Sequence, residues 1–298
     1  MKYTLSKQVK DAINNNKPVL ALESTILASG MPHPENIGFY NRAVEICSGL
    51  GVVPATVAII KGEIHVGLSQ NQLEHITTSR SVQKVSKREI GICLHKKLSG
   101  ATTVSSTSHI AHHAGIRVFS TGGIGGVHRG YNNTMDMSQD LLSLQKTPLI
   151  VVSSGVKSFL NVEKTVEALE TMGVTKIGYK TNRFPLFYTA LSNIDLPHSV
   201  NGVDEVVSIY KKNISCHIES SVLVLNPVPK KHEIPSDTIN TIISKSIIKM
   251  KKLGVVGKKT TPFLLSEIAK QTKNKSLNTN IALALNNIQL GAEIACSF

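Results

Sequence analysis

The chain has 298 residues, of which 33 are Lys or Arg and 20 are Asp or Glu, so its formal net charge is +13. Hydrophobic residues make up 41% and charged residues 18%, a balance that excludes an intrinsically disordered chain. A length near 300 is enough for one large domain that needs neither disulfides nor a structural metal to stay folded. The four cysteines lie far apart without a Cys-x-x-Cys pair, which indicates free thiols in a reducing compartment.

The positive charge does not by itself indicate a nucleic-acid partner. Lysines are spread along the chain, aromatic residues are only 4%, and there is no Trp for base stacking. A diffuse basic field fits the capture of small anions, phosphates above all. The N-terminus is polar, without a signal-peptide pattern, and no apolar run approaches 18 residues. We therefore expect a cytoplasmic protein that binds neither nucleic acid nor membrane.

Strand-like and helix-like segments alternate along the chain. Short apolar runs predict strands at 18–23, 53–60, 63–67, 116–120, 149–154, 175–179 and 222–226, with 53–67 forming a hairpin around a Gly turn. Helical spacing of apolar residues covers 34–50, 85–98, 103–113, 136–145, 159–172 and most of the chain after 236. This order predicts a single three-layer α/β/α domain over 1–298, with a mixed and largely parallel sheet.

Ligands of such sheets bind beyond the carboxyl ends of the strands, so the residues that follow each apolar run are the candidates for a site. Glu23 follows the first predicted strand. It is either a capping or ion-paired carboxylate or a general acid whose protonated form is favoured by burial.

A glycine-rich loop, Thr121 to Gly130, follows the strand at 116–120. Five glycines in ten residues let the backbone approach a ligand, and their amides can bind a phosphate. The loop does not fit the dinucleotide pattern, because His128 and Arg129 intervene before any helix. An anion-binding loop in which Thr121 and His128 bind substrate is one interpretation, and a plain tight turn is the other.

Two carboxylates, Asp136 and Asp140, stand four residues apart in the predicted helix at 136–145. On one helix face they offer hard oxygen ligands that suit Mg²⁺ or Mn²⁺ beside a phosphate loop. Capping of the helix by Asp136 explains the same residue equally well.

Lys157 follows the buried strand at 149–154. A dry position there favours the neutral amine, which is nucleophilic towards carbonyl carbon. A surface lysine on the next helix is the alternative. Lys84 could hold a phosphate as a point charge or face solvent. His109 and His113 are spaced i, i+4 but lack the Glu of a His-Glu-x-x-His zinc site, so we do not assign them a metal.

Several unusual strings occur in a characteristic order along the chain. They are ALEST (21–25), VPAT (53–56), KVS (84–86), GATTV (100–104), TGGIGGVHRG (121–130), GVKS (155–158), TPFLL (261–265) and the stretch 280–287. With them, the sequence from about Leu20 to Ala295 resembles the pseudouridine-5'-phosphate glycosidases, the indigoidine-synthase-A-like family.

The resemblance implies roles for individual residues. Glu23 would be the proton donor, Lys157 the nucleophile, and Asp136 the ligand of one Mn²⁺ per subunit. Lys84 would bind the sugar phosphate, and further substrate contacts would come from Val104, Ser138, Gln139, Asp140 and Asn280, the last near the uracil. The family usually has Ala where Gln139 stands, which leaves open whether this side chain enters the site.

The implied reaction is the reversible cleavage of the C–C glycosidic bond of pseudouridine 5'-phosphate, which gives uracil and ribose 5-phosphate, in a homotrimer. Glu23 would protonate the ring oxygen, and Lys157 would attack C1' to form an imine that serves as electron sink while uracil leaves. Two rival functions remain at this point: another sugar-phosphate lyase or transferase that uses the same lysine, and a non-enzymatic RNA-binding protein.

Overall fold

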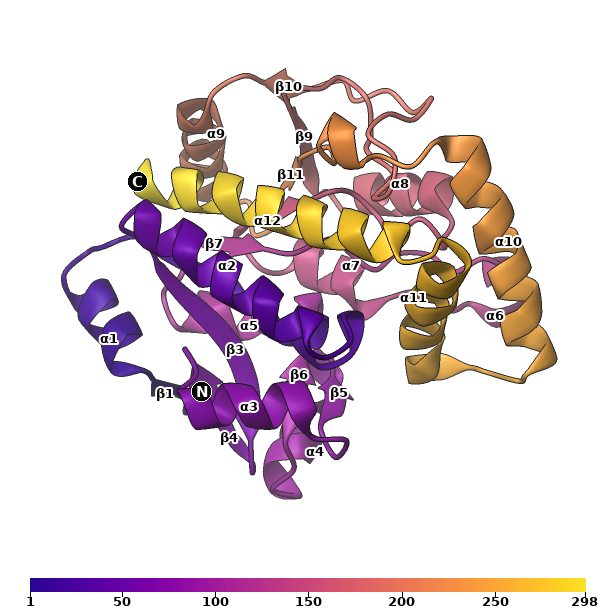
Figure 1. Ribbon diagram of the computed structural model, residues 1–298. Helices are drawn as coiled ribbons and strands as arrows, with labels where there is room; N and C mark the ends of the chain where they lie inside the picture. Colours follow the sequence, from indigo (N-terminus) through magenta and orange to yellow (C-terminus); the bar gives the residue numbers. More distant parts are fainter.

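A computed structural model describes residues 1–298 and contains an 11-stranded sheet (Figure 1). The main path of the sheet runs in the order β1-β4-β3-β2-β7-β8-β11-β9-β10, and β6 pairs with β3 and carries β5. The strands are β1 Thr4–Leu5, β2 Val19–Leu22, β3 Val53–Ile60, β4 Glu63–Val66, β5 Gln83–Val85, β6 Gly100–Thr102, β7 Val118–Ser120, β8 Ile150–Ser153, β9 Thr175–Tyr179, β10 Ser199–Val200 and β11 Val222–Leu225.

The centre of the sheet is parallel. β2 pairs with β3 and β7, β8 pairs with β7 and β11, and β9 pairs with β11 and β10, all in parallel. The far half of β3 pairs in antiparallel fashion with β4 and β6. The residues of β2, β7, β8 and β11 are all buried, as expected for strands covered by helices on both faces.

Helices cover both faces of the sheet. In Figure 1, α2 (Glu35–Gly49) and the long α12 (Lys275–Cys296) lie side by side in front of it, with α5 (Val104–His113) and α7 (Gln139–Gln145) behind it. The other helices are α1 Lys7–Asn14, α3 Gln70–Thr78, α4 Ile90–His95, α6 Tyr131–Thr134, α8 Val162–Thr171, α9 Val203–Ser215, α10 Ser236–Lys252 and α11 Thr260–Gln271. The predicted three-layer α/β/α fold with a mixed, largely parallel sheet is therefore confirmed.

One hydrophobic cluster of 71 buried residues runs from Val9 to Ala295 and joins the layers into a single core. α12 contributes most to the C-terminal part of this core and packs on β2, β7 and β8. None of the helices combines the length and the apolar character needed to cross a bilayer.

Two predicted helices are partly wrong. The segment 85–98 begins as the end of β5, continues as a 3-10 turn (η2, Lys87–Glu89) and becomes α-helical only from Ile90 to His95. The segment 136–145 is helical only from Gln139, because Ser138 caps α7 and Met137 pairs with Val127 in a β-bridge. Asp136 and Asp140 therefore do not share a helix face.

Candidate active site

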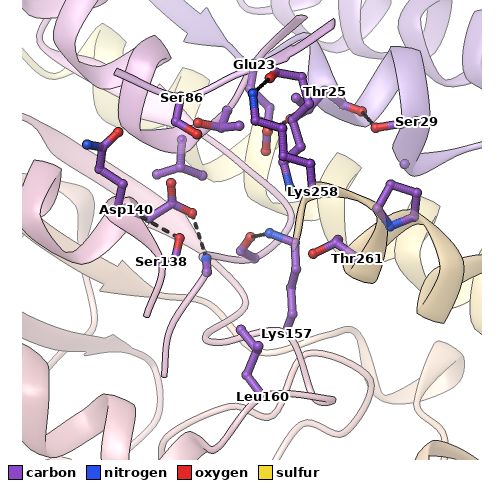
Figure 2. Close-up of a pocket in the computed structure, with 18 of the residues that line it drawn as sticks. Glu23, Thr25, Ser29, Ser86, Ser138, Asp140, Lys157, Leu160, Lys258 and Thr261 are labelled. Carbon is purple, nitrogen blue, oxygen red and sulfur yellow. Dashed lines mark hydrogen bonds between the residues drawn. The ribbon is translucent and has the colours of Figure 1, made fainter. Parts of the chain in front are cut away.

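A polar cavity of about 210 Å³ lies at the carboxyl ends of the central strands. Only six of its 28 lining residues are hydrophobic, which excludes a purely apolar ligand. Figure 2 shows the side chains of Glu23, Asp140 and Lys157 around this cavity. The predicted site residues that line it are Glu23, Lys84, Val104, His128, Asp136, Ser138, Gln139, Asp140, Lys157 and Asn280.

Glu23 follows the last residue of β2 and is only 7% exposed. The Thr121 hydroxyl donates a hydrogen bond of 2.5 Å to Oε1 of Glu23, and the Thr25 hydroxyl donates to Oε2. Thr121 itself follows β7, so the adjacent strands β2 and β7 deliver the acid and one of its partners together. This carboxyl group is held in a fixed orientation at the edge of the cavity.

Lys157 reaches the cavity through a sharp turn after β8. Gly155 in this turn has φ +83°, and a Cβ atom there would lie 2.1 Å from the Pro185 carbonyl oxygen, so only glycine fits. The Lys157 amino group donates a hydrogen bond to the carbonyl of Gly123 in the glycine loop. Its only hydrogen-bond partner is thus neutral, and no carboxylate within ion-pair distance fixes its charge.

Asp140 anchors the wall opposite Lys157. Its Oδ1 accepts the backbone N–H of Ser105 at 3.0 Å, and its Oδ2 accepts that of Gly125 at 2.9 Å. Ser138 caps the same helix, α7, by accepting the Asp140 N–H. A Cβ atom on Gly125 would approach the Ser138 hydroxyl to 2.3 Å, so glycine is required where the loop meets α7.

The Gln139 side chain turns towards a neighbouring loop. Its Oε1 accepts the backbone N–H of Arg88 at 3.0 Å and so ties α7 to η2, which follows the strand that carries Lys84. Its amide oxygen is therefore engaged with protein, even though the residue lines the cavity.

Lys84 is partly buried in the wall of the cavity. Burial lowers the pKa of its amino group, and the positive charge of Lys157 lowers it further, against the opposing effect of Asp140 and Glu23. The Lys84 amino group, placed in the wall of a polar cavity, offers a binding site for an anion.

A metal ion has one free carboxylate available in this cavity. Asp136 is half-exposed, with Oδ2 3.7 Å from Nδ1 of His128, while both oxygens of Asp140 are occupied by backbone N–H groups. Burial lowers the pKa of His128, and the neighbouring Asp136 carboxylate opposes this shift. No group of three or more His, Cys, Asp or Glu side chains is arranged to hold a metal. These residues fit a Mg²⁺- or Mn²⁺-type ion that keeps most of its waters.

Val104 and Asn280 line the cavity from the start of α5 and from α12, respectively. Thr121 does not line it, because its side chain lies behind Glu23 and its carbonyl accepts a hydrogen bond of 2.8 Å from Asn287. Thr121 therefore holds Glu23 in place and does not itself face a ligand in the cavity.

Two important residues escaped the sequence reasoning. Asn287 is fully buried in α12, where it donates to Thr121 and Ser154 and accepts from Asn226, so it joins the ends of β7, β8 and β11. Its spacing of seven residues from Asn280, which places the two side chains on the same face of α12, was the available signal. Lys258 also lines the cavity. In the sequence it stands next to Lys259 in a lysine-rich stretch typical of a solvated surface, so nothing distinguished it as a site residue.

The chain is similar over nearly its whole length to proteins of one family. The model of the "Indigoidine synthase A like protein" family matches residues 8–297. Pseudouridine-5'-phosphate glycosidase from Staphylococcus aureus is 43% identical over 97% of this chain and 94% of its own, and that from Fervidobacterium nodosum is 44% identical over 98% of both.

Two solved structures have the same fold. An indigoidine synthase A-like protein from Thermotoga maritima matches with a TM-score of 0.88 and 39% identity over 94% of this chain and 92% of its own. The prealnumycin C-glycosynthase AlnA, in complex with ribulose 5-phosphate, matches with a TM-score of 0.91 and 29% identity over 99% and 96%. Since sequence and fold agree over nearly the whole length, the chain belongs to the indigoidine synthase A-like family.

Proposed function

We propose that this protein is an enzyme that reversibly cleaves the C–C glycosidic bond of pseudouridine 5'-phosphate to uracil and ribose 5-phosphate. The observation that carries the proposal is the meeting of Glu23, Lys157 and Lys84 at one polar cavity, in a chain that is 43% identical to glycosidases of this name. A substrate that is both a phosphate and a sugar matches the acid, the amine and the cation found there.

The bond to be broken explains why a lysine stands where other glycosidases use a second carboxylate. In an ordinary glycoside, the leaving oxygen is protonated by a carboxylic acid. A C–C bond offers no such atom, so the electron pair of the bond must move onto the uracil ring. A lysine amine bound to C1' can drive this step, because its nitrogen lone pair forms a protonated imine with C1' as the bond breaks.

The first step opens the ribose ring. The neutral Lys157 amine attacks C1', the C1'–O4' bond breaks, and Glu23 gives its proton to O4'. The hydrogen bonds from Thr25 and Thr121 hold the carboxyl group of Glu23 for this transfer. The product is a ring-opened sugar bound through nitrogen, with uracil still attached to C1'.

The second step expels the base. The attacking nitrogen first gives its extra proton to the Glu23 carboxylate. Its lone pair then forms the C1'=N bond while the C1'–C5 bond breaks, the electron pair of that bond moves onto the uracil ring, and Glu23 returns the proton to C5. Water then adds to the imine and releases Lys157 and ribose 5-phosphate. Overall, one water is consumed, and the reverse sequence makes the C–C bond.

The remaining residues bind the substrate. Lys84 holds the phosphate, His128 and Ser138 line its approach, and Asn280 and Val104 contact the base or the sugar. Gln139 and Asp140 mainly hold the walls of the cavity in place, since their side-chain oxygens accept hydrogen bonds from backbone N–H groups. Thr121 positions Glu23.

One manganese ion per subunit belongs to the proposal, with Asp136 as its protein ligand. When bound, such an ion polarises oxygen ligands and orders the waters and substrate groups around it. Asp136→Asn should raise the Mn²⁺ concentration needed for half-maximal activity by at least tenfold. Titration of EDTA-treated enzyme with Mn²⁺ measures this, and equal Mn²⁺ curves for both proteins would contradict the assignment. A cytoplasmic location and a homotrimeric state are also predictions.

Covalent trapping tests the central step. Borohydride added to the enzyme with ribose 5-phosphate should reduce the imine and add one sugar-phosphate mass to the peptide that contains Lys157. Lys157→Arg, which keeps the charge but is a poor nucleophile, should give no adduct and no release of uracil from pseudouridine 5'-phosphate. Release of uracil at the wild-type rate by this variant would refute the mechanism, and failure of the wild-type enzyme to release uracil would refute the function.

A further inference from the structure

No role has been given so far to the TPFLL string (261–265), which together with the four preceding residues forms the segment GKKTTPFLL, 257–265. It covers the 3-10 turn η4 (Gly257–Lys259) and the first half of α11, in the helical hairpin that α10 and α11 form beside the cavity (Figure 1). From this hairpin, Gly257, Lys258, Thr261, Pro262 and Leu265 line the cavity. The hairpin therefore supplies one wall of the site.

Lys258 crosses from this wall to the strand that carries Lys84. Its amino group donates a hydrogen bond of 3.0 Å to the backbone carbonyl of Lys84 and lies 3.4 Å from Oε1 of Glu89. The side chain is nevertheless 49% exposed, and Glu89 already accepts closer hydrogen bonds of 2.8 Å from Arg88 and from the Ser86 N–H. Half-exposed contacts of this kind contribute little free energy and exchange readily.

The charges in the cavity leave a phosphate with too few partners unless Lys258 takes part. A phosphate monoester carries nearly two negative charges at neutral pH. Lys157 must remain free to react, and Arg88 is 69% exposed and paired with Glu89. Of the lysines and arginines that line the cavity, Lys84 and Lys258 remain, and the Lys258 amino group lies 3.0 Å from the backbone carbonyl oxygen of Lys84.

We propose that Lys258 is a second phosphate-binding residue, which the α10–α11 hairpin brings to the cavity to clamp the substrate phosphate between itself and Lys84. The proposal rests on the proposed function. On binding, Lys258 exchanges its contacts with Glu89 and the Lys84 carbonyl for phosphate oxygens, so the phosphate ties the hairpin to β5. The neighbouring Lys259 is exposed and does not line the cavity, which makes it a matched control.

The experiment compares Lys258→Met with Lys259→Met at constant ionic strength. Calorimetry should show at least tenfold weaker binding of ribose 5-phosphate to Lys258→Met and an unchanged affinity in Lys259→Met. In turnover, Lys258→Met should raise KM for pseudouridine 5'-phosphate with a change in kcat of less than threefold. Lys258→Arg should restore most of the affinity.

A second substrate separates phosphate binding from a structural role. Unphosphorylated pseudouridine, assayed at high concentration, should react equally with wild type and Lys258→Met. Equal losses on both substrates, equal losses in the Lys259 variant, or unchanged ribose 5-phosphate binding would each overturn the proposal. Since calorimetry with ribose 5-phosphate requires no turnover, this result is separable from failure of the wild-type enzyme to cleave pseudouridine 5'-phosphate.

Discussion

The two hydroxyl groups on Glu23 decide how well it can act as an acid. Thr121 and Thr25 each donate to one carboxylate oxygen, and Thr121 belongs to the neighbouring strand end. We expect Thr121→Val to lower kcat about ten- to a hundredfold, because its hydrogen bond stabilises the carboxylate that forms as Glu23 gives up its proton, and a hydrogen bond to a charged group is worth about 1.5–3 kcal/mol. KM should change little, since the Thr121 side chain does not face the cavity.

Steady-state kinetics measures this split, and Thr121→Ser is the control, because it keeps the hydroxyl. If the serine variant loses as much kcat as the valine variant, packing and not hydrogen bonding explains the effect.

Lys84 illustrates a residue that serves binding at the expense of stability. Its pKa is lowered in the folded protein, by burial first and by Lys157 second, so the charged form is less favourable there than in the unfolded chain. The destabilisation is complete below the folded-state pKa and disappears as the pH rises towards the unfolded value. Lys84→Met should therefore raise the free energy of unfolding at pH 7, with a smaller gain at pH 10, while it weakens ribose 5-phosphate binding.

Urea unfolding at the two pH values measures the change, with the exposed Lys10→Met on α1 as control. A variant less stable than wild type at pH 7 would show that the Lys84 amine makes favourable contacts that outweigh its burial.

At the scale of the single residue, ten of the site residues predicted from the sequence line the cavity. Glu23 and Lys157 follow buried apolar runs, and strand ends of a parallel sheet converge at one edge. The directions of Thr121 and Gln139 could not be predicted, because each depends on a partner from a distant part of the chain: Glu23 for the first and Arg88 for the second.

At the scale of the element, the glycine loop and α7 form one unit around Asp140. Gly125→Ala places a methyl group 2.3 Å from the Ser138 hydroxyl and 2.7 Å from Oδ2 of Asp140. We expect a loss of about 1–3 kcal/mol in stability from the overpacking, together with a large loss of activity, because the wall of the cavity must move.

Gly91→Ala is the matched control. Gly91 lies in α4, and nothing stands within 4 Å of its added Cβ atom, so alanine should stabilise the helix by about 0.5–1 kcal/mol without changing activity. Thermal unfolding and a uracil-release assay on both variants test the pair. Normal activity in Gly125→Ala would mean that the loop can shift freely.

Element boundaries were predicted well where a single periodicity dominates. The hairpin of β3 and β4 and the helices α2 and α5 were predicted to within a few residues. The segment 85–98 was not, because β5 has only three residues and is held by pairing with β6, a long-range contact that no local pattern records. The Asp136–Asp140 pair failed for a related reason, since the bridge between Val127 and Met137 delays the start of α7.

At the scale of the whole molecule, part of the net charge of +13 is concentrated at the cavity. Lys84, Lys157 and Lys258 come from three distant parts of the chain and meet at one cavity. This convergence supports the capture of a small phosphate and removes the need for a polymer as partner.

The predicted homotrimer is testable on the whole enzyme. Light scattering coupled to size-exclusion chromatography should give the mass of three chains at micromolar concentration. A mass of one or two chains would contradict the prediction that follows from the family resemblance.

The long last helix has a consequence for biosynthesis. α12 supplies Asn280 to the cavity and Asn287 to three strand ends, and it fills the core against β2, β7 and β8. A ribosome adds about 5–20 residues per second, so it needs about 15–60 s for these 298 residues. Throughout that time, the strand ends lack the helix that covers and orders them. We therefore expect a nascent chain in which α12 has not yet docked to be inactive and to expose the apolar residues of β2, β7 and β8 that this helix covers.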